Sequence, residues 1–244
     1  MKVVILSDIH GNFDALSALH EDYDQLWVLG DLVNYGPQPA EVINFLRKRA
    51  THVVRGNHDH CIGFGEDPRC SPRFREMAEA TRKYTDSILS DDDKRYLRSL
   101  PLQVNVRVGN TRCRLCHAVP SDPLFTYCPP DSERWVEECR IAGADVLLTG
   151  HTHIPCGIHV ENTLLVNPGS LGQPKSGGPR ACCAVFKDGK VGLRSFAYPV
   201  DKTVEKIRAM PIPAAIQEDL ITVLRTGAGP EERNKGEYVE NRLG

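Results

Sequence analysis

The amino-acid sequence predicts an α/β protein in which helices cover a mixed or mostly parallel sheet. In the first half of the chain, short apolar runs alternate with helix-like patterns, as in successive βαβ units. The second half is richer in strand-like runs, two of which flank the turn sequence Lys187-Asp188-Gly189-Lys190. No internal repeat and no Ser/Gly-rich linker divides the 244 residues. We therefore expect one domain over residues 1–226.

Each element follows from its local pattern. Apolar runs bounded by polar residues indicate strands at 3–6, 26–29 and 52–54, and helical spacing indicates helices at 13–19 and 40–49. Residues 59–71 contain Gly63, Gly65 and Pro68 and are predicted to be a loop. Helices are then expected over 73–89 and from Ser90 to about residue 100, because Ser90 and three Asp residues form a cap-like start. We expect the region near 60–100 to be a helical, lid-like insertion.

The second half is predicted to be mainly strands, followed by two helices. Strands are expected at 102–108, 112–116, 145–148, 157–160, 163–166, 181–186 and 191–198. Helices are expected at 131–141, 204–210 and 214–224. The tail at 227–244 is charged and contains glycine, so we expect it to be disordered.

The composition excludes several classes of protein. The 30 Lys and Arg residues nearly balance 32 Asp and Glu residues, whereas a dedicated nucleic-acid or membrane-surface binder needs a basic patch. No apolar run approaches the roughly 20 residues of a membrane span. The first apolar run is also too short for a secretory leader, so we expect a cytoplasmic protein. The sequence leaves the oligomeric state open.

The nine cysteines are expected to stay reduced in that compartment. Cys113 and Cys116 form one CxxC motif, but no second pair stands at the spacing of a structural zinc site. We interpret these two residues, Cys156 and the adjacent Cys182 and Cys183 as small residues packed on strands.

Potential metal ligands follow five of the predicted strands. They occur in Ser7-Asp8-Ile9-His10-Gly11-Asn12, Gly30-Asp31, Gly56-Asn57-His58-Asp59, His117 and Gly150-His151-Thr152-His153. The carboxyl ends of strands in an α/β sheet meet at one crevice, so these segments should converge. In extended backbone, residues two apart point the same way, so Asp8 with His10, and His151 with His153, should each aim at one point. Burying so many polar groups costs several kcal/mol apiece unless a cation lies between them.

In this order the segments resemble the motifs of the calcineurin-like metallophosphoesterase family: D-x-H, G-D, G-N-H-D/E, a later single His and G-H-x-H. The motifs span residues 8–153, and Asn167-Pro168-Gly169-Ser170 is similar to a segment of the small bacterial and archaeal phosphodiesterase branch. The resemblance implies a four-layer αββα sandwich of two mixed sheets flanked by helices. It further implies a dinuclear phosphoesterase that cleaves phosphodiester or phosphomonoester bonds in a small phosphorylated substrate.

The resemblance also implies the ligands of two divalent metal ions. The first ion would bind Asp8, His10, Asp31 and His153, and the second Asp31, Asn57, His117 and His151. Two ions roughly 3.5–4 Å apart can clamp a phosphoryl group and generate a metal-bound hydroxide that attacks phosphorus. The two carboxylates offset only part of the ions' charge, so the site would attract phosphate. Imidazole, carboxylate and amide ligands without thiolate suit Mn, Fe, Co, Ni or Zn rather than Ca, and we expect Mn²⁺.

His58 is the candidate catalytic residue. The resemblance implies that it binds no metal and faces the substrate phosphate. As an imidazolium it can protonate the leaving oxygen or neutralise charge in the transition state, because the pKa of His lies near the working pH. Asp59 and Asn34 are its two candidate orienting partners, and the sequence does not decide between them.

Two positions depart from the pattern of Ser/Thr protein phosphatases and dinucleoside-tetraphosphate hydrolases. Tyr35 stands where those enzymes usually have an Arg that grips phosphate, and Asn34 stands where many phosphoprotein phosphatases have an Asp. Both departures weaken the interpretation as a phosphoprotein phosphatase. A non-catalytic scaffold, like the retromer subunit of this fold, would lack ligands that are present here. A metallo-β-lactamase-like hydrolase would need HxHxDH in one stretch, which this chain lacks.

Other charged residues are given structural roles or left open. We interpret His20, His52 and His159 as surface or structural residues. For His60 and Arg55 the sequence does not decide between a contact with substrate and a structural role. Three arginines are candidates to replace the missing Arg: Arg69, Arg73 and Arg75. The loops near 59–75 and 118–130 should set the substrate, and the apolar helices near Ile207 and 220–224 should pack internally or form a dimer contact.

Overall fold

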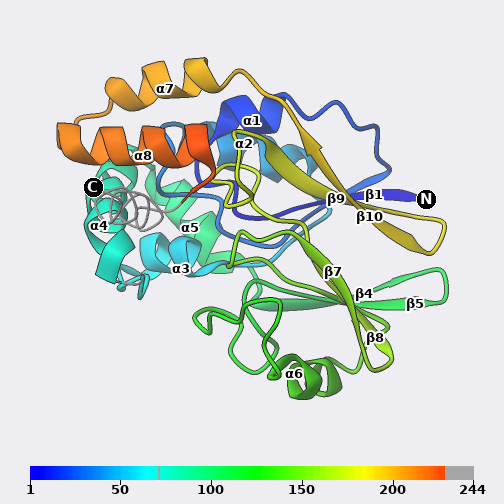
Figure 1. The fold of residues 1–244 in the computed structure, drawn as a ribbon. Helices are drawn as coiled ribbons and strands as arrows, with labels where there is room; N and C mark the ends of the chain where they lie inside the picture. Colours follow the sequence, from blue (N-terminus) through cyan, green and yellow to red (C-terminus); the bar gives the residue numbers. More distant parts are fainter. Residues whose placement is uncertain (71, 229–244) are drawn as a thin grey trace, which may run out of the picture.

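Two five-stranded sheets lie against each other between layers of helices in the computed structural model (Figure 1). The structure describes residues 1–70 and 72–228, without the side chains of residues 72 and 73. The first sheet contains β1 (Lys2–Leu6), β2 (Gln25–Val28), β3 (His52–Val53), β9 (Ala181–Lys187) and β10 (Lys190–Phe196). The second contains β4 (Gln103–Val108), β5 (Thr111–Cys116), β6 (Val146–Leu148), β7 (Cys156–Val160) and β8 (Thr163–Asn167).

Helices flank both sheets. They are α1 (Phe13–Ser17), α2 (Pro39–Arg49), α3 (Asn57–Phe64), α4 (Pro72–Ile88), α5 (Asp91–Ser99), α6 (Trp135–Ala142), α7 (Val200–Arg208) and α8 (Ala214–Thr226). Figure 1 shows α6 on the outer side of the second sheet and α1, α2 and α7 on the opposite side of the molecule. Within the described residues, every helix is too short or too polar to span a bilayer. The predicted fold class, with two mixed sheets flanked by helices, is confirmed.

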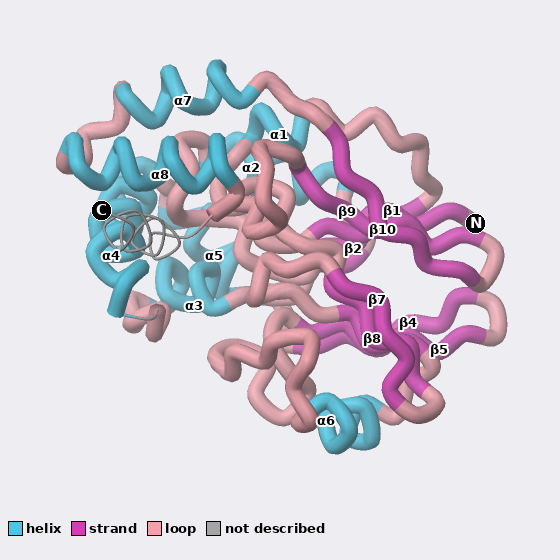
Figure 2. The backbone as a smooth tube through the Cα atoms, in the orientation of Figure 1, coloured by secondary structure: helices cyan, strands magenta, loops and turns pink. Residues whose placement is uncertain are grey.

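Each sheet contains a parallel triplet. The order of the first sheet is β10-β9-β1-β2-β3, in which β1, β2 and β3 are parallel. The order of the second is β4-β5-β6-β8-β7, in which β5, β6 and β8 are parallel. The antiparallel strands lie outside these triplets. The loops that follow the two triplets gather on the side of the sheets that faces α3 and α5 (Figure 2).

Alternation along β1 explains why the strand contributes to two cores. Val3 and Ile5 are fully buried among residues of the second sheet, whereas Val4 and Leu6 are fully buried among residues of the flanking helices. Successive side chains of a strand point to opposite faces, so a continuous apolar run indicates burial on both sides. The apolar run in the sequence therefore reflects a strand between two layers.

The expected loop over 59–71 is wrong in its first part, where the chain forms α3. Gly63 suggested a loop, but it lies inside this helix because α5 packs closely against it: Arg98 Nη1 donates to the Gly63 carbonyl at 2.8 Å. The carboxylate of Asp59 also accepts the Gly56 N–H at 2.9 Å and so secures the start of the helix.

Other boundaries differ by a few residues from those expected. Helix α6 begins at Trp135 rather than residue 131, α7 begins at Val200 rather than 204, and β10 ends at Phe196 rather than 198. Gly227 ends α8 in the left-handed conformation. Residues 229–244, which make up most of the predicted disordered tail, lie outside the described residues.

Candidate metal centre

Two buried carboxylates lie at the carboxyl ends of β1 and β2, and both are oriented in the same way. Oδ1 of Asp31 accepts the backbone N–H of His58 at 2.9 Å, and Oδ2 of Asp8 accepts that of His151 at 3.2 Å. The other oxygen of each carboxylate points toward imidazoles. Asp31 Oδ2 lies 3.3 Å from His117 Nε2 and 3.8 Å from His10 Nε2. Asp8 Oδ1 has no hydrogen-bond partner among the described residues.

Backbone carbonyls determine which nitrogen of three imidazoles faces the carboxylates. The Nδ1 atoms of His10, His117 and His153 lie 3.0, 2.7 and 2.7 Å from the carbonyl oxygens of Val33, Leu29 and Gln173. A carbonyl only accepts hydrogen bonds, so each Nδ1 carries a proton. When such a ring is neutral, its Nε2 presents a lone pair, which is the form that binds a metal.

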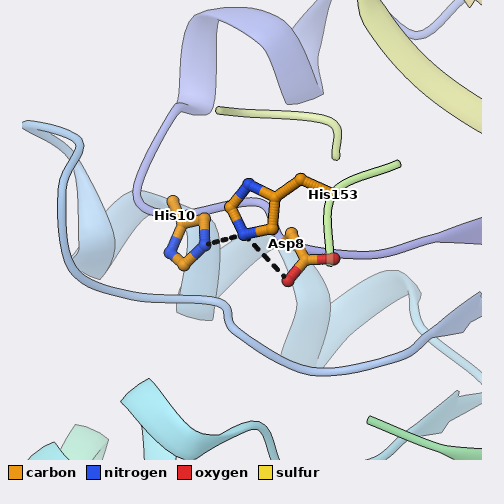
Figure 3. Close-up of side chains that lie close together, drawn as sticks. All are labelled: Asp8, His10 and His153. Atoms are coloured by element: carbon orange, nitrogen blue, oxygen red, sulfur yellow. Dashed lines mark hydrogen bonds and ion pairs between the residues drawn. The ribbon is translucent and has the colours of Figure 1, made fainter. Parts of the chain in front are cut away.

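The first group of potential ligands comprises Asp8, His10 and His153 (Figure 3). The Nε2 atoms of His10 and His153 lie 3.2 Å apart, and His153 Nε2 lies 3.4 Å from Asp8 Oδ1. Burial lowers the pKa of His10 to about 3 and that of His153 well below its usual value. At neutral pH two lone pairs therefore face each other beside a carboxylate oxygen that lacks a donor. A cation among these three atoms would remove the repulsion.

The second group comprises Asp31, His117 and His151, and Asn57 adjoins it. His117 Nε2 lies 3.2 Å from His151 Nδ1 and 3.1 Å from Asn57 Oδ1. The Asn57 amide donates through Nδ2 to the Pro68 carbonyl at 2.8 Å, so its oxygen is turned toward the group. The group therefore offers a carboxylate, two imidazoles and an amide oxygen.

Burial and charge shift the pKa values of the two imidazoles of the second group in opposite directions. Burial lowers the pKa of His151 to about 3. Burial opposes the imidazolium of His117 as well, but the charge of Asp31 raises the pKa of His117 to about 9. For Asp31, burial opposes ionisation, yet the charges of His117 and His58 bring its pKa well below the usual range. In the absence of a cation, a proton on His117 thus compensates the Asp31 carboxylate.

Several potential metal ligands have a left-handed backbone conformation, which differs from the extended backbone that was expected. Five of the potential ligands have positive φ angles between 47° and 66°: Asp8, His10, Asp31, His151 and His153. Such conformations cost about 1–3 kcal/mol each for non-glycine residues and cluster at functional sites. The expectation that His151 and His153 aim at one point was wrong, because their backbone is left-handed rather than extended. The two side chains enter different groups.

Close approach of the segments requires glycine at two positions. A Cβ atom at Gly56 would overlap Asp31 Oδ1, and one at Gly150 would overlap Ser7 Oγ. Both glycines precede potential ligands, Asn57 and His151. This close packing explains why glycine stands beside these residues in the sequence.

His58 lies beside the two groups, and its ring contacts Asn34, Cys70 and Tyr35. Asn34 Nδ2 donates to His58 Nδ1 at 2.7 Å, which makes Asn34 the orienting partner. Asp59 instead accepts the backbone N–H groups of Asp31 and Leu32, both at 2.8 Å. On its other side, His58 Nε2 lies 3.6 Å from Cys70 Sγ. Burial opposes the imidazolium, but the charges of Cys70 and Asp31 raise the pKa of His58 to about 9.

Two of these contacts were missed by sequence reasoning. Tyr35 is buried, and its ring centroid lies 4.8 Å from that of His10 and 4.9 Å from that of His58. Tyr35 Oη also lies 3.6 Å from Cys70 Sγ. The phenol ring therefore packs against the centre at the position where Ser/Thr protein phosphatases and dinucleoside-tetraphosphate hydrolases usually have an Arg. No local signal identified Cys70, because its contacts form through tertiary structure.

The arginines and the histidine that the sequence offered as possible substrate contacts have different surroundings. The Arg69 guanidinium lies 4.1 Å from the Phe125 ring centroid, and Arg75 lines a cavity beside α4. The side chain of Arg73 lies outside the described residues. Arg55 donates to the Arg98 carbonyl at 2.7 Å, and His60 lies 3.3 Å from Glu66 and stacks on Phe64.

The remaining predicted residues mostly have structural surroundings. His20 and His159 are exposed, and His52 is half-buried against Trp27. Buried cysteines occupy four strand positions, Cys113, Cys116, Cys182 and Cys183, and Cys156 is half-buried. Ile207 and Leu220 are buried in a core shared with α4, so the two C-terminal helices pack internally.

Comparisons with known proteins agree with this arrangement. Residues 1–189 match the model of the calcineurin-like phosphoesterase superfamily domain. The crystal structure of a metallophosphoesterase from Sphaerobacter thermophilus has a TM-score of 0.78 and 28% identity, with 93% of this chain and 100% of that chain covered. An uncharacterized protein of Methanocaldococcus jannaschii is 29% identical over 89% of this chain and 96% of its own length.

A second kind of relative matches only part of the chain. A symmetrical bis(5'-nucleosyl)-tetraphosphatase of Vibrio campbellii is 42% identical over 127 residues, which are 48% of this chain and 44% of that protein. The chain thus matches less than half the length of this relative.

Proposed function

This chain belongs to the calcineurin-like phosphoesterase superfamily and is a phosphoric ester hydrolase, and we propose that it acts through two divalent metal ions. The first ion would bind Asp8, His10, Asp31 and His153, and the second Asp31, Asn57, His117 and His151. One observation carries the proposal: Oδ2 of Asp31 lies 3.8 Å from His10 Nε2 and 3.3 Å from His117 Nε2. A single oxygen thus adjoins both groups of potential ligands.

The donor set supports metal binding in both groups. In the first group two neutral imidazole nitrogens face each other across 3.2 Å, and Asp8 Oδ1 has no donor among the described residues. In the second group His117 Nε2 lies 3.2 Å from His151 Nδ1, where a cation would replace the proton of His117. The ligands are nitrogen and oxygen atoms without thiolate, which suits first-row transition metals, and we propose Mn²⁺. When bound, such ions polarise a phosphoryl group and supply a nucleophile from water at neutral pH.

The protein's own residues would bind and neutralise the substrate. Asp8 and Asp31 carry at most two negative charges, so a centre with two divalent ions stays positive and favours an anionic phosphoester. His58 Nε2 would hold a proton and donate it to the oxygen that leaves phosphorus. Asn34 would orient the His58 ring through Nδ1. Asn34 Oδ1 has no partner among the described residues, and turning the amide over would let it accept a proton from Nδ1 of the imidazolium.

We propose a small phosphodiester or phosphomonoester as the substrate class. Tyr35 supports this choice over a phosphoprotein, because a buried phenol packed on His10 and His58 provides no bidentate grip on phosphate. The guanidinium of Arg69 is exposed beside Phe125 and is a candidate contact for the anionic group.

A second candidate activity is hydrolysis of a dinucleoside polyphosphate. The partial relative from Vibrio campbellii carries the name of such an enzyme. Tyr127 provides a specific observation in favour, because the residue is 53% exposed and its ring centroid lies 5.9 Å from that of His151. An exposed aromatic ring beside a phosphate site can stack on a nucleobase.

One experiment tests the function and separates the two candidates. Purified protein would be stripped of metal, loaded with Mn²⁺ and assayed on bis(p-nitrophenyl) phosphate, p-nitrophenyl phosphate and diadenosine tetraphosphate. We expect metal-dependent turnover of at least one simple ester. Preference for the tetraphosphate, with KM raised by Tyr127→Ala but not by Tyr127→Phe, would favour the second candidate. Two bound ions without turnover of any of the three esters would instead favour a non-catalytic scaffold.

A further inference from the structure

Cys70 has contacts on two sides of the segment that leads into α4. On one side its Sγ atom lies 3.6 Å from His58 Nε2 and 3.6 Å from Tyr35 Oη. On the other side Cys70 lines a cavity of about 280 Å³, which is also bordered by the exposed residue Glu66 and by Arg82 of α4. None of the proposed metal ligands lines this cavity, so a reagent in it would approach Cys70 from outside the candidate metal centre.

The surroundings of Cys70 favour the thiolate, which is the reactive form of cysteine. Both His58 Nε2–H and Tyr35 O–H can donate to the sulfur. Two hydrogen-bond donors at 3.6 Å stabilise the sulfur anion relative to the thiol. Cys156 provides an internal comparison, because it is the other half-buried cysteine and burial raises its pKa. The other seven cysteines are buried.

We propose that Cys70 is an oxidisable thiol whose modification by a hydroperoxide switches off His58; the effect on His58, though not the reactivity of the thiol, rests on the proposed function. The thiolate sulfur attacks one oxygen of hydrogen peroxide, a sulfur–oxygen bond forms and the oxygen–oxygen bond breaks. Sulfur is oxidised by two electrons to a sulfenic acid, and the departing hydroxide takes up a proton to become water.

The modification would act directly on the proton that catalysis needs. The sulfur lies 3.6 Å from His58 Nε2, so a sulfenic oxygen that turns toward the ring would accept the Nε2 proton and compete for it with a leaving oxygen. Sulfenic acids are reduced by thiols, so the inhibition would be reversible.

The reactivity of the thiol is tested without any assay of catalysis. The full-length protein would be treated with limiting iodoacetamide, and alkylation at each cysteine would be followed by peptide mass spectrometry. We expect Cys70 to react at least about tenfold faster than Cys156. Equal rates at the two positions, or faster reaction at a buried cysteine, would overturn the proposal.

The effect on catalysis is tested with hydrogen peroxide on the Mn²⁺-loaded enzyme. We expect activity to fall and dithiothreitol to restore it, with the matched control Cys156→Ser behaving like the parent. Cys70→Ser and Cys70→Ala should both resist the peroxide, provided that circular dichroism shows them folded. If both variants lose activity as fast as the parent, oxidation occurs elsewhere and the switch is refuted. If the untreated parent has no phosphoesterase activity, the proposed function fails, whereas the alkylation rates still decide the status of Cys70.

Discussion

The backbone N–H of His58 donates a 2.9 Å hydrogen bond to Oδ1 of Asp31, so the first turn of α3 joins the two residues with the most distinct proposed roles. Asp31 is proposed to bind both metal ions, whereas His58 is proposed to bind neither. The bond uses the main chain of His58 and leaves its ring free to meet Asn34 and Cys70. Substitution of either side chain should therefore have a different effect on metal content.

Asp31→Asn should abolish turnover and lower metal content. The substitution keeps the shape of the side chain but removes the negative charge beside His10 and His117. We expect fewer than two ions per chain by elemental analysis after reconstitution and dialysis. Asp86→Asn, on an exposed carboxylate paired with Lys94, serves as the control and should retain both ions. Full occupancy in Asp31→Asn would refute the bridging role.

His58→Ala should slow catalysis without emptying the centre. Loss of a general acid costs about 10²–10⁴ in rate, so we expect kcat to fall within that range. The backbone bond to Asp31 persists in this variant, and two ions per chain should remain by elemental analysis. Loss of metal from His58→Ala would show that the division of roles between His58 and Asp31 is wrong.

Asn34 should act by positioning His58 rather than by contacting substrate. Asn34→Ala is expected to lower kcat about tenfold with KM unchanged, because the ring loses its partner at Nδ1. Asn34→Asp places a carboxylate beside the imidazolium and so raises its pKa. Activity that requires protonated His58 is lost as the pH rises through that pKa, so the alkaline limb of the pH–rate profile should move upward. An unchanged limb in a folded Asn34→Asp variant would argue against this role.

Metal binding should release about one proton at pH 7.5. The pKa of His117 in the metal-free centre is about 9, so this ring is protonated at that pH, whereas His10 and His151, with pKa values of about 3, are already neutral. Below pH 9 the apparent affinity should weaken about tenfold per unit, and more steeply below the pKa of Asp8, which burial raises to about 6. Calorimetry of Mn²⁺ binding in buffers of different ionisation enthalpy measures the proton count, and a count of zero would contradict the expectation.

Ile5→Ala should destabilise the chain by about 2–5 kcal/mol in chemical denaturation. Ile5 is fully buried between the two sheets, so its truncation leaves a cavity that neither sheet can close. Ile141→Ala removes an isoleucine that is 45% exposed on α6 and should change stability by less than about 0.5 kcal/mol. Similar effects at both positions would contradict the proposed packing between the sheets.

Much of the fold was predictable because its determinants are local. The continuous apolar run at Val3–Leu6 and its counterpart in β2 indicate strands buried on both faces, and Gly189 marks the hairpin between β9 and β10. Local pattern failed at α3, where Gly63 suggested a loop. The close approach of α5, which lies some 30 residues further along the chain, explains that glycine.

The candidate metal centre was likewise predictable only in its locally determined features. The sequence by itself determined which residue types are present and that they follow strands, since the order of motifs is written along the chain. Only the tertiary structure decided that Asn34 rather than Asp59 orients His58, that His151 and His153 enter different groups, and that Cys70 contacts the catalytic candidate. The physical reason is that each of these facts depends on left-handed backbone or on contacts between segments distant in sequence, and neither leaves a periodic signal in the order of residues.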